Sequence, residues 1–141
     1  MDVRELQREA EDGSVVAQTI LGTCYLDGIE VKSDYTKAFR LLRSAAEQGA
    51  SRAVTNLARM YAEGLGTAKN LSEALRLYEV AAKAGEFLAQ IELARLYSRG
   101  IGIAADREKA LKWYSAAAAQ EQVVSDCEEL REAKTFIHSA S

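Results

Sequence analysis

The stretch LARMYAEGLG, from Leu57 to Gly66, returns as LARLYSRGIG from Leu93 to Gly102. Six of the ten residues are identical, and the two copies lie 36 residues apart. Self-similarity at a fixed period of this length is typical of repeat proteins, in which each repeat is one supersecondary unit. The period extends beyond these two copies and predicts three repeats of 36 residues, at 13–48, 49–84 and 85–120.

Each repeat has the apolar spacing of two helices. In the first half, shared residues recur every four positions, and in the second half every three or four, which places each set on one helix face. The shared first-half positions are Ala17/Ala53/Ala89, Leu21/Leu57/Leu93 and Tyr25/Tyr61/Tyr97, and the second-half ones are Ala38/Ala74/Ala110, Ala45/Ala81/Ala117 and Ala46/Ala82/Ala118. The sequence therefore predicts a helix hairpin in every repeat.

The joints between the two helices carry matching stop and start signals. Glycine is common after the last turn of a helix because it takes a left-handed conformation, and Asp or Asn is a good N-cap. The stop positions are Gly28, Gly64 and Gly100, and the start positions are Asp34, Asn70 and Asp106. Glu30 stands where the later repeats carry Gly66 and Gly102, so this loop is expected to differ in the first repeat.

The two ends of the chain predict additional helices. Residues 1–12 align with the second half of a repeat and predict a lone helix. Residues 121–141 predict a capping helix and tail, with an apolar stripe of Val123, Cys127, Leu130 and Ile137. Because neither helix of a hairpin can bury its stripe alone, stacked hairpins share a continuous core. The prediction is an all-α solenoid in one domain, 1–141.

Composition argues against several classes of function. The formal net charge of −3 and the pI near 5.3 argue against binding of nucleic acid through its phosphates. No apolar run approaches the roughly 18 residues of a membrane span, and no apolar signal region follows the charged N-terminus, so a cytoplasmic protein is expected. The two cysteines, Cys24 and Cys127, belong to repeat one and to the cap, and are not expected to bond.

The sequence contains none of the usual arrangements of catalytic or metal-binding residues. The single histidine, His138, lies three residues from the end, where a weakly packed side chain is expected. No zinc, phosphate-loop or nucleophile-elbow motif is present. We therefore predict no catalytic, cofactor-binding or metal-binding residue, no cofactor and no enzymatic activity.

The repeat pattern resembles the Sel-1-like repeat family, which is related to tetratricopeptide arrays. About 108 residues, three units of 36, carry the resemblance, including KALKWYSAAA from Lys109 to Ala118. In the second repeat the pattern residues are Ala53, Leu57, Ala58, Tyr61, Gly64, Gly66, Asn70, Ala74, Ala81 and Ala82. The resemblance implies a right-handed α/α solenoid of stacked antiparallel hairpins, whose first helices line a concave face.

By analogy with tetratricopeptide arrays, the groove is lined by residues that flank the shared leucine and tyrosine positions. The predicted protein-binding residues are Thr19, Thr23, Arg52, Thr55, Arg59, Glu63, Leu88, Ile91, Arg95 and Arg99. Their four arginines form a stripe that would suit carboxylates of a partner, because the guanidinium pairs with them through two bonds. In the alternative interpretation the arginines are solvated, or pair locally with Glu63 and Glu92.

The resemblance implies a non-catalytic adaptor or scaffold that binds a protein or peptide in this groove, and the arginine stripe favours an acidic one. A dedicated inhibitor or immunity protein is the alternative. A β-lactam-binding or hydrolysing enzyme is less favoured, because that branch of the family carries a cysteine pair in each repeat. Neither nucleic acid nor membrane is expected as a partner. The sequence leaves the oligomeric state open, with a monomer expected, and a fragment of a longer array remains an alternative.

Overall fold

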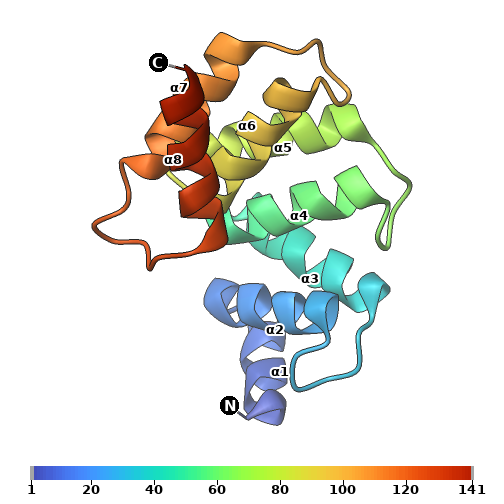
Figure 1. The fold of residues 1–141 in the computed structure, drawn as a ribbon. Helices are drawn as coiled ribbons and strands as arrows, with labels where there is room; N and C mark the ends of the chain where they lie inside the picture. The colour runs from blue at the N-terminus through green and yellow to red at the C-terminus, as the bar shows by residue number, and fades with distance from the viewer. Residues whose placement is uncertain (1, 141) are drawn as a thin grey trace. The chain divides into compact units, whose positions relative to one another are not determined.

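The computed structural model describes residues 2–140, and these form eight α-helices and no strand (Figure 1). The helices are α1 (Val3–Glu11), α2 (Val15–Asp27), α3 (Tyr35–Glu47), α4 (Ser51–Glu63), α5 (Leu71–Lys83), α6 (Phe87–Arg99), α7 (Arg107–Ala118) and α8 (Glu128–Ala140). The predicted pair of helices in every repeat is confirmed. The chain divides into two compact units, Met1–Leu77 and Tyr78–Ser141, with the division inside α5.

In the first unit, α2 packs against both α1 and α3, and α3 packs against α4. The core contains Leu42 and Met60, both fully buried, and the alanines Ala38 and Ala45, which have no exposed surface. Small residues let neighbouring helices approach closely. At Gly22 of α2 an added Cβ would lie 2.7 Å from Cγ of Leu42, so this crossing has no room for a side chain unless Leu42 moves.

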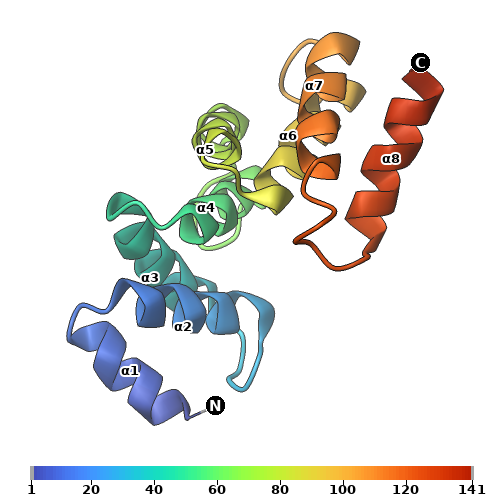
Figure 2. The same ribbon diagram turned by 90° about the vertical axis from the view of Figure 1, so that its left-hand side faces the viewer.

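In the second unit, α6 packs against α7, and α7 packs against α8 (Figure 2). The alanines Ala89, Ala110 and Ala117 have no exposed surface, as the repeat pattern predicts. Trp113 and Tyr114 of α7 are also buried. The second-half signature of the third repeat therefore supplies the large side chains of this core.

The hairpin joints have the predicted geometry. Gly28, Gly64 and Gly100 end α2, α4 and α6 in the left-handed conformation, with φ between 68° and 70°. The side chains of Asp34 and Asp106 accept the backbone N–H groups of Lys37 and Lys109, and Asn70 accepts that of Glu73. Local stop and cap signals thus fix where each helix of a hairpin ends and begins.

The loop of the first repeat differs in sequence but not in backbone conformation at position 30. Glu30 has φ of 63°, close to the 70° of Gly66 and Gly102, and is the one non-glycine residue with positive φ in residues 2–140. The expected difference in conformation at this position is wrong. Since the left-handed region costs an L-residue roughly 1–2 kcal/mol, Glu30 is held there by the rest of the hairpin.

Replacing Glu30 with glycine should therefore raise the free energy of unfolding. Relief of the left-handed strain exceeds the extra backbone entropy of glycine in the unfolded chain, and the net gain expected is about 0.5–1 kcal/mol. Urea unfolding followed by circular dichroism measures it. Glu30→Ala serves as the control, because it removes the charge but keeps the strain, and it should leave stability nearly unchanged. Equal stabilisation by both variants would contradict the prediction.

The C-terminal helix begins later than the sequence predicts. Residues 121–127 form turns and a bend, and α8 starts at Glu128. The predicted apolar stripe is wrong at Val123 and Cys127, which both lie in this connection; Val123 is 81% exposed, whereas Leu130 of α8 is buried. The physical reason is that the connection is not itself helical, so Val123 cannot share a helix face with Leu130. His138 is exposed and lies within α8 rather than in a tail.

Candidate functional site

The predicted groove residues lie on three helices, α2, α4 and α6, and their exposure varies widely. Five of the ten are exposed: Arg52, Arg59 and Glu63 on α4, and Leu88 and Arg99 on α6. Three are partly buried: Thr19 and Thr23 on α2, and Arg95 on α6. The predicted residues therefore mark an exposed face on α4 and on α6, whereas the two on α2 are both partly buried.

Two of the predicted residues, Thr55 and Ile91, are buried and present no surface to a partner. Their exposed fractions are 5% and 0%. Both stand three residues after the exposed line that begins at Arg52 and Leu88. At 3.6 residues per turn, this spacing turns a side chain about 60° away from that line. Thr55 and Ile91 therefore lie on the buried edge of the predicted groove face and not on its exposed side.

The three threonine side chains form hydrogen bonds within their own helices. The hydroxyls of Thr19, Thr23 and Thr55 each donate to the carbonyl oxygen four residues earlier, at 2.8–3.1 Å. The hydroxyl oxygen of Thr23 also accepts a bond from Nδ2 of Asn56, at 3.0 Å. This bond joins α2 to α4 within the first unit.

Arg59 of α4 is held by two carboxylates. Its Nη1 lies 3.0 Å from Oδ1 of Asp27 in α2, and its Nε lies 2.9 Å from Oε2 of Glu63, one turn later in α4. All three side chains are at least 36% exposed, so the pairs are screened by water and contribute little to stability. Their effect is to neutralise Arg59 on the face where a partner carboxylate was expected.

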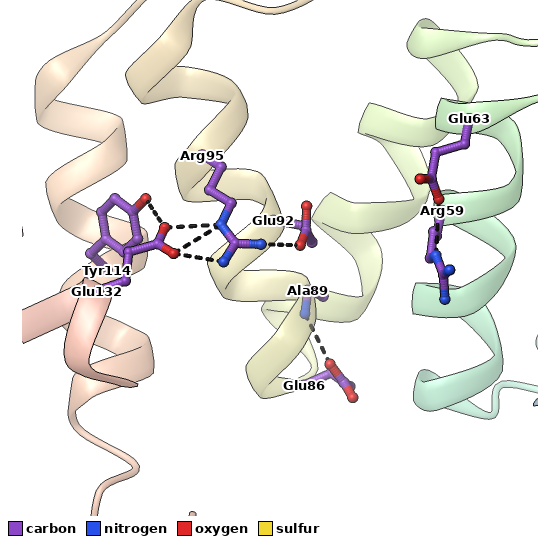
Figure 3. Close-up of polar contacts among 8 residues, drawn as sticks. All are labelled: Arg59, Glu63, Glu86, Ala89, Glu92, Arg95, Tyr114 and Glu132. Atoms are coloured by element: carbon purple, nitrogen blue, oxygen red, sulfur yellow. Dashed lines mark hydrogen bonds and ion pairs between the residues drawn. The ribbon is translucent and has the colours of Figure 1, made fainter. Parts of the chain in front are cut away.

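Arg95 of α6 lies at the centre of a more enclosed cluster (Figure 3). Its Nε and Nη2 donate to both oxygens of Glu132 in α8, at 2.6–3.1 Å, and its Nη1 donates to Glu92. The hydroxyl of Tyr114 in α7 donates to Oε2 of Glu132, at 2.6 Å. The side chains of Arg95 and Glu132 are only 24% and 28% exposed. Three helices of the second unit therefore meet at one carboxylate.

The surroundings of this cluster shift the protonation of its members. Donation by the Arg95 guanidinium holds the pKa of the Glu132 carboxyl below its usual range. Burial raises the pKa of Tyr114, and its bond to the ionised Glu132 raises it further. Glu132 is therefore charged and Tyr114 neutral at neutral pH, which is the combination that the observed hydrogen bonds require.

The depressed pKa of Glu132 predicts an acid-sensitive contribution to stability. A carboxyl whose folded pKa is lowered stabilises the fold fully above its unfolded pKa, about 4.3, and loses this effect as pH falls through the folded value. The advantage of wild type over Glu132→Gln in unfolding free energy should be largest at pH 7 and shrink below about pH 4. Urea titrations of both proteins at several pH values measure it, and an advantage independent of pH would contradict the prediction.

The arginine stripe divides into two paired and two unpaired members. Pairing of Arg59 with Glu63 and of Arg95 with Glu92, the alternative left open by the sequence, is confirmed. Arg52 and Arg99 are exposed and form no ion pair with any residue from 2 to 140. The charge of Arg99 still lies close enough to lower the pKa of Glu132. Arg52 and Arg99 are thus the stripe residues available to a partner.

Sequence reasoning missed one residue in each unit that bears on the predicted binding residues. Glu132 lies in α8, where the connection 121–127 interrupts the 36-residue register, so the repeat spacing could not identify it. Ile20 is 39% exposed and lies one turn after Val16, which is 69% exposed, on the same side of α2. The four-residue step between two apolar side chains outside the shared packing positions was the available signal.

Two other kinds of site are absent from residues 2–140. Among residues 2–140, no group of three or more His, Cys, Asp or Glu side chains is arranged to hold a metal ion. None of the helices in the same range is long and apolar enough to cross a membrane. Both cysteines are free thiols, with Cys24 buried.

Comparisons with known proteins find three copies of one repeat in the chain. The Sel1 repeat profile matches three segments, residues 15–49, 51–86 and 88–121. No curated protein matches the chain. The crystal structure of a Sel1 repeat protein from Oxalobacter formigenes is similar, with 40% identity, a TM-score of 0.77 and 98% of each chain covered.

A second similar structure is that of c5321, described as a protective antigen present in uropathogenic Escherichia coli strains that displays an SLR fold. It is 29% identical with a TM-score of 0.79, and the match covers all of this chain but 34% of the antigen, so this chain spans about a third of that protein. The three repeat matches and these neighbours show an all-α helical-repeat solenoid. The chain belongs to the Sel1 repeat family.

Proposed function

We propose that the chain is a non-catalytic protein–protein interaction module, an adaptor or scaffold that binds a protein or peptide through exposed residues of its first helices. One observation carries the proposal. Each unit has both exposed apolar surface and an arginine that forms no ion pair with a carboxylate in the part of the chain that the structure describes. Membership of the Sel1 repeat family supports a protein partner in general terms. The chemistry of the face supports a partner that carries both carboxylates and apolar side chains.

In the first unit, the face is formed by α2 and α4. Val16 and Ile20 are exposed on α2, and the bond between Thr23 and Asn56 holds this side of α2 against α4. Arg52 stands exposed one turn before Asn56. An apolar anchor over α2 and a carboxylate against Arg52 are therefore the two contacts that this unit offers.

In the second unit, α6 offers the same two elements at its opposite ends. Leu88 is 42% exposed in the first turn, and Arg99 is exposed in the last. Arg99 lies 11 positions after Leu88, which returns it to about the same side of the helix after a rise of about 16 Å. Arginine suits this role because its planar fork binds a carboxylate through two charge-assisted hydrogen bonds.

The test is capture of partners from a native lysate by the wild-type chain and by Arg52→Glu/Arg99→Glu, with identification by mass spectrometry. These two arginines are chosen because reversal at Arg59 or Arg95 would break internal ion pairs. We expect a protein that wild type captures to be lost from the variant, and to be retained by Lys32→Glu/Lys69→Glu, which makes the same charge change at exposed loop positions. Equal capture by all three folded proteins would contradict the proposal.

A further inference from the structure

A second candidate site lies on the opposite side of α2 from Val16 and Ile20. A hollow of about 440 Å³ opens between α1, α2 and α3 in the first unit. Its α2 wall consists of Gln18, Leu21 and Tyr25, which lie about half a turn around the helix from the exposed pair. This hollow is therefore separate from the face to which the proposed function is assigned.

The lining of the hollow is apolar in the middle and polar at its ends. Leu21 and Leu41 supply the apolar surface. At one end the side-chain amide of Gln18 donates to the carbonyl oxygen of Ala10 and accepts from the hydroxyl of Ser44. This amide therefore already has hydrogen-bond partners within the chain. The other end lies seven residues along α2, roughly 10 Å away, at Tyr25.

The Tyr25 end carries positive charge. Lys37 and Arg40 of α3 line the hollow, and both side chains are exposed. The ammonium of Lys37 stands over the ring of Tyr25, 5.3 Å from its centre. Neither cation forms an ion pair with a carboxylate anywhere in residues 2–140. The hydroxyl of Tyr25 accepts a bond from Nε2 of Gln7, which leaves its own proton free to be donated.

Comparison with the next repeat shows what this end lacks. At the equivalent positions, 36 residues later, Arg76 is bound by Glu73 at i,i+3 on α5. In α3 the residue three before Arg40 is Lys37 instead, so two cations stand where the second repeat has an ion pair, as they also do in the third repeat at Lys109 and Lys112. Like charges at this spacing repel each other in an isolated helix. An external anion would supply the missing negative charge.

We infer that the hollow between α1, α2 and α3 binds a carboxylate attached to an apolar group, with the carboxylate at Lys37 and Arg40 and the apolar group on Leu21 and Leu41. The volume lies within the range of about 300–1,000 Å³ that is usual for small-molecule sites. Glu11 on the α1 wall is the one carboxylate in the lining, and it disfavours a second negative charge on the ligand. A free organic acid and the C-terminal residue of a peptide both present this chemistry.

The test uses N-acetyl-leucine as the probe and follows backbone amides of the full chain by two-dimensional NMR. We expect saturable shifts confined to residues of the hollow, and none from N-acetyl-leucinamide, which has the same apolar group without the charge. In Lys37→Gln/Arg40→Gln the dissociation constant should rise about tenfold or more, because each lost cation removes a charge-assisted bond. Lys69→Gln/Lys83→Gln makes the same charge change at exposed positions outside the hollow and should bind as wild type does.

A second arm separates the two sources of the carboxylate. Tighter binding of acetyl-Ala-Ala-Leu than of N-acetyl-leucine would assign the site to a chain terminus, and equal or weaker binding would assign it to a free acid. Equal binding of the amide, shifts spread over other surfaces, or unchanged affinity in the folded Lys37→Gln/Arg40→Gln variant would overturn the inference. So would the absence of a saturable shift from either carboxylate.

Discussion

Replacement of Glu132 with alanine is expected to lower the free energy of unfolding by about 2–4 kcal/mol and to loosen α8 from the second unit. Glu132 accepts hydrogen bonds from Nε and Nη2 of Arg95 in α6 and from the hydroxyl of Tyr114 in α7. Removal of this carboxylate takes the main hydrogen-bond partner from the Arg95 guanidinium and the Tyr114 hydroxyl, which are both mostly shielded from water. That penalty, rather than the attraction lost, makes the expected effect large.

Glu92 reduces the loss of stability expected for Glu132→Ala but does not abolish it. Its carboxylate still pairs with Nη1 of Arg95 in the variant, so the cation keeps one partner. The other two donors, Nε and Nη2, face the space vacated by Glu132. The expected cost is therefore below that of stripping a fully buried ion of all its partners, which reaches about 3–5 kcal/mol.

Two measurements check this prediction. Urea unfolding gives the change in stability, and hydrogen exchange should show faster exchange in Glu128–Ala140 than in wild type. Glu73→Ala is the matched control, because it breaks an i,i+3 pair with Arg76, whose side chain is 62% exposed. That pair should contribute less than about 1 kcal/mol. Equal losses in the two variants would show that the Glu132 cluster is no more than a surface ion pair.

The helices and their joints were predictable because their signals are local and occur three times. Gly28, Gly64 and Gly100 act within one turn of the helices that they end, and Asp34, Asn70 and Asp106 act within one turn of those that they begin. A repeat also states each signal more than once, so a single departure does not hide it. Glu30 shows the limit of prediction from local signals, because the hairpin holds it in a left-handed conformation that glutamate does not favour.

The candidate surface was less predictable because exposure and pairing depend on neighbouring helices. Arg95 and Arg59 occupy equivalent positions, yet one is mostly enclosed by Glu132 and the other stays open beside Asp27. The difference comes from α8, which follows a connection outside the repeat. Sequence spacing therefore placed the arginines on a helix face but could not say which of them would remain free.

One contact could have been predicted from the sequence and was not. Gln18 is bonded to Gln48 in the first unit, and Gln90 to Gln120 in the second. The equivalent positions of the middle repeat are Val54 and Ala84, so both glutamines are replaced by apolar residues together. A buried polar side chain needs a partner, and the joint replacement indicates that these two positions face each other.

Replacement of Gly66 with alanine is expected to cost about 3 kcal/mol or more, because it combines backbone strain with a steric clash. Gly66 has φ of 70°, and a Cβ there would lie 2.5 Å from the carbonyl oxygen of Tyr35 and 2.9 Å from its carbonyl carbon. Backbone atoms cannot turn away as the end of a flexible side chain can. The loop must therefore separate from the start of α3, or the left-handed turn must open.

Gly64→Ala separates the two contributions. Gly64 also has φ of 70°, but a Cβ there would meet nothing closer than the Cβ of Lys69, at 3.3 Å. This variant should lose only the roughly 1–2 kcal/mol of left-handed strain. Urea unfolding of both variants beside wild type measures the difference, and equal losses would show that Tyr35 does not restrict position 66. The same contact distinguishes position 66 from position 30, where a glutamate takes nearly the same φ with its side chain exposed. Glycine is thus required at position 66 by the neighbouring helix, and at position 64 by the turn alone.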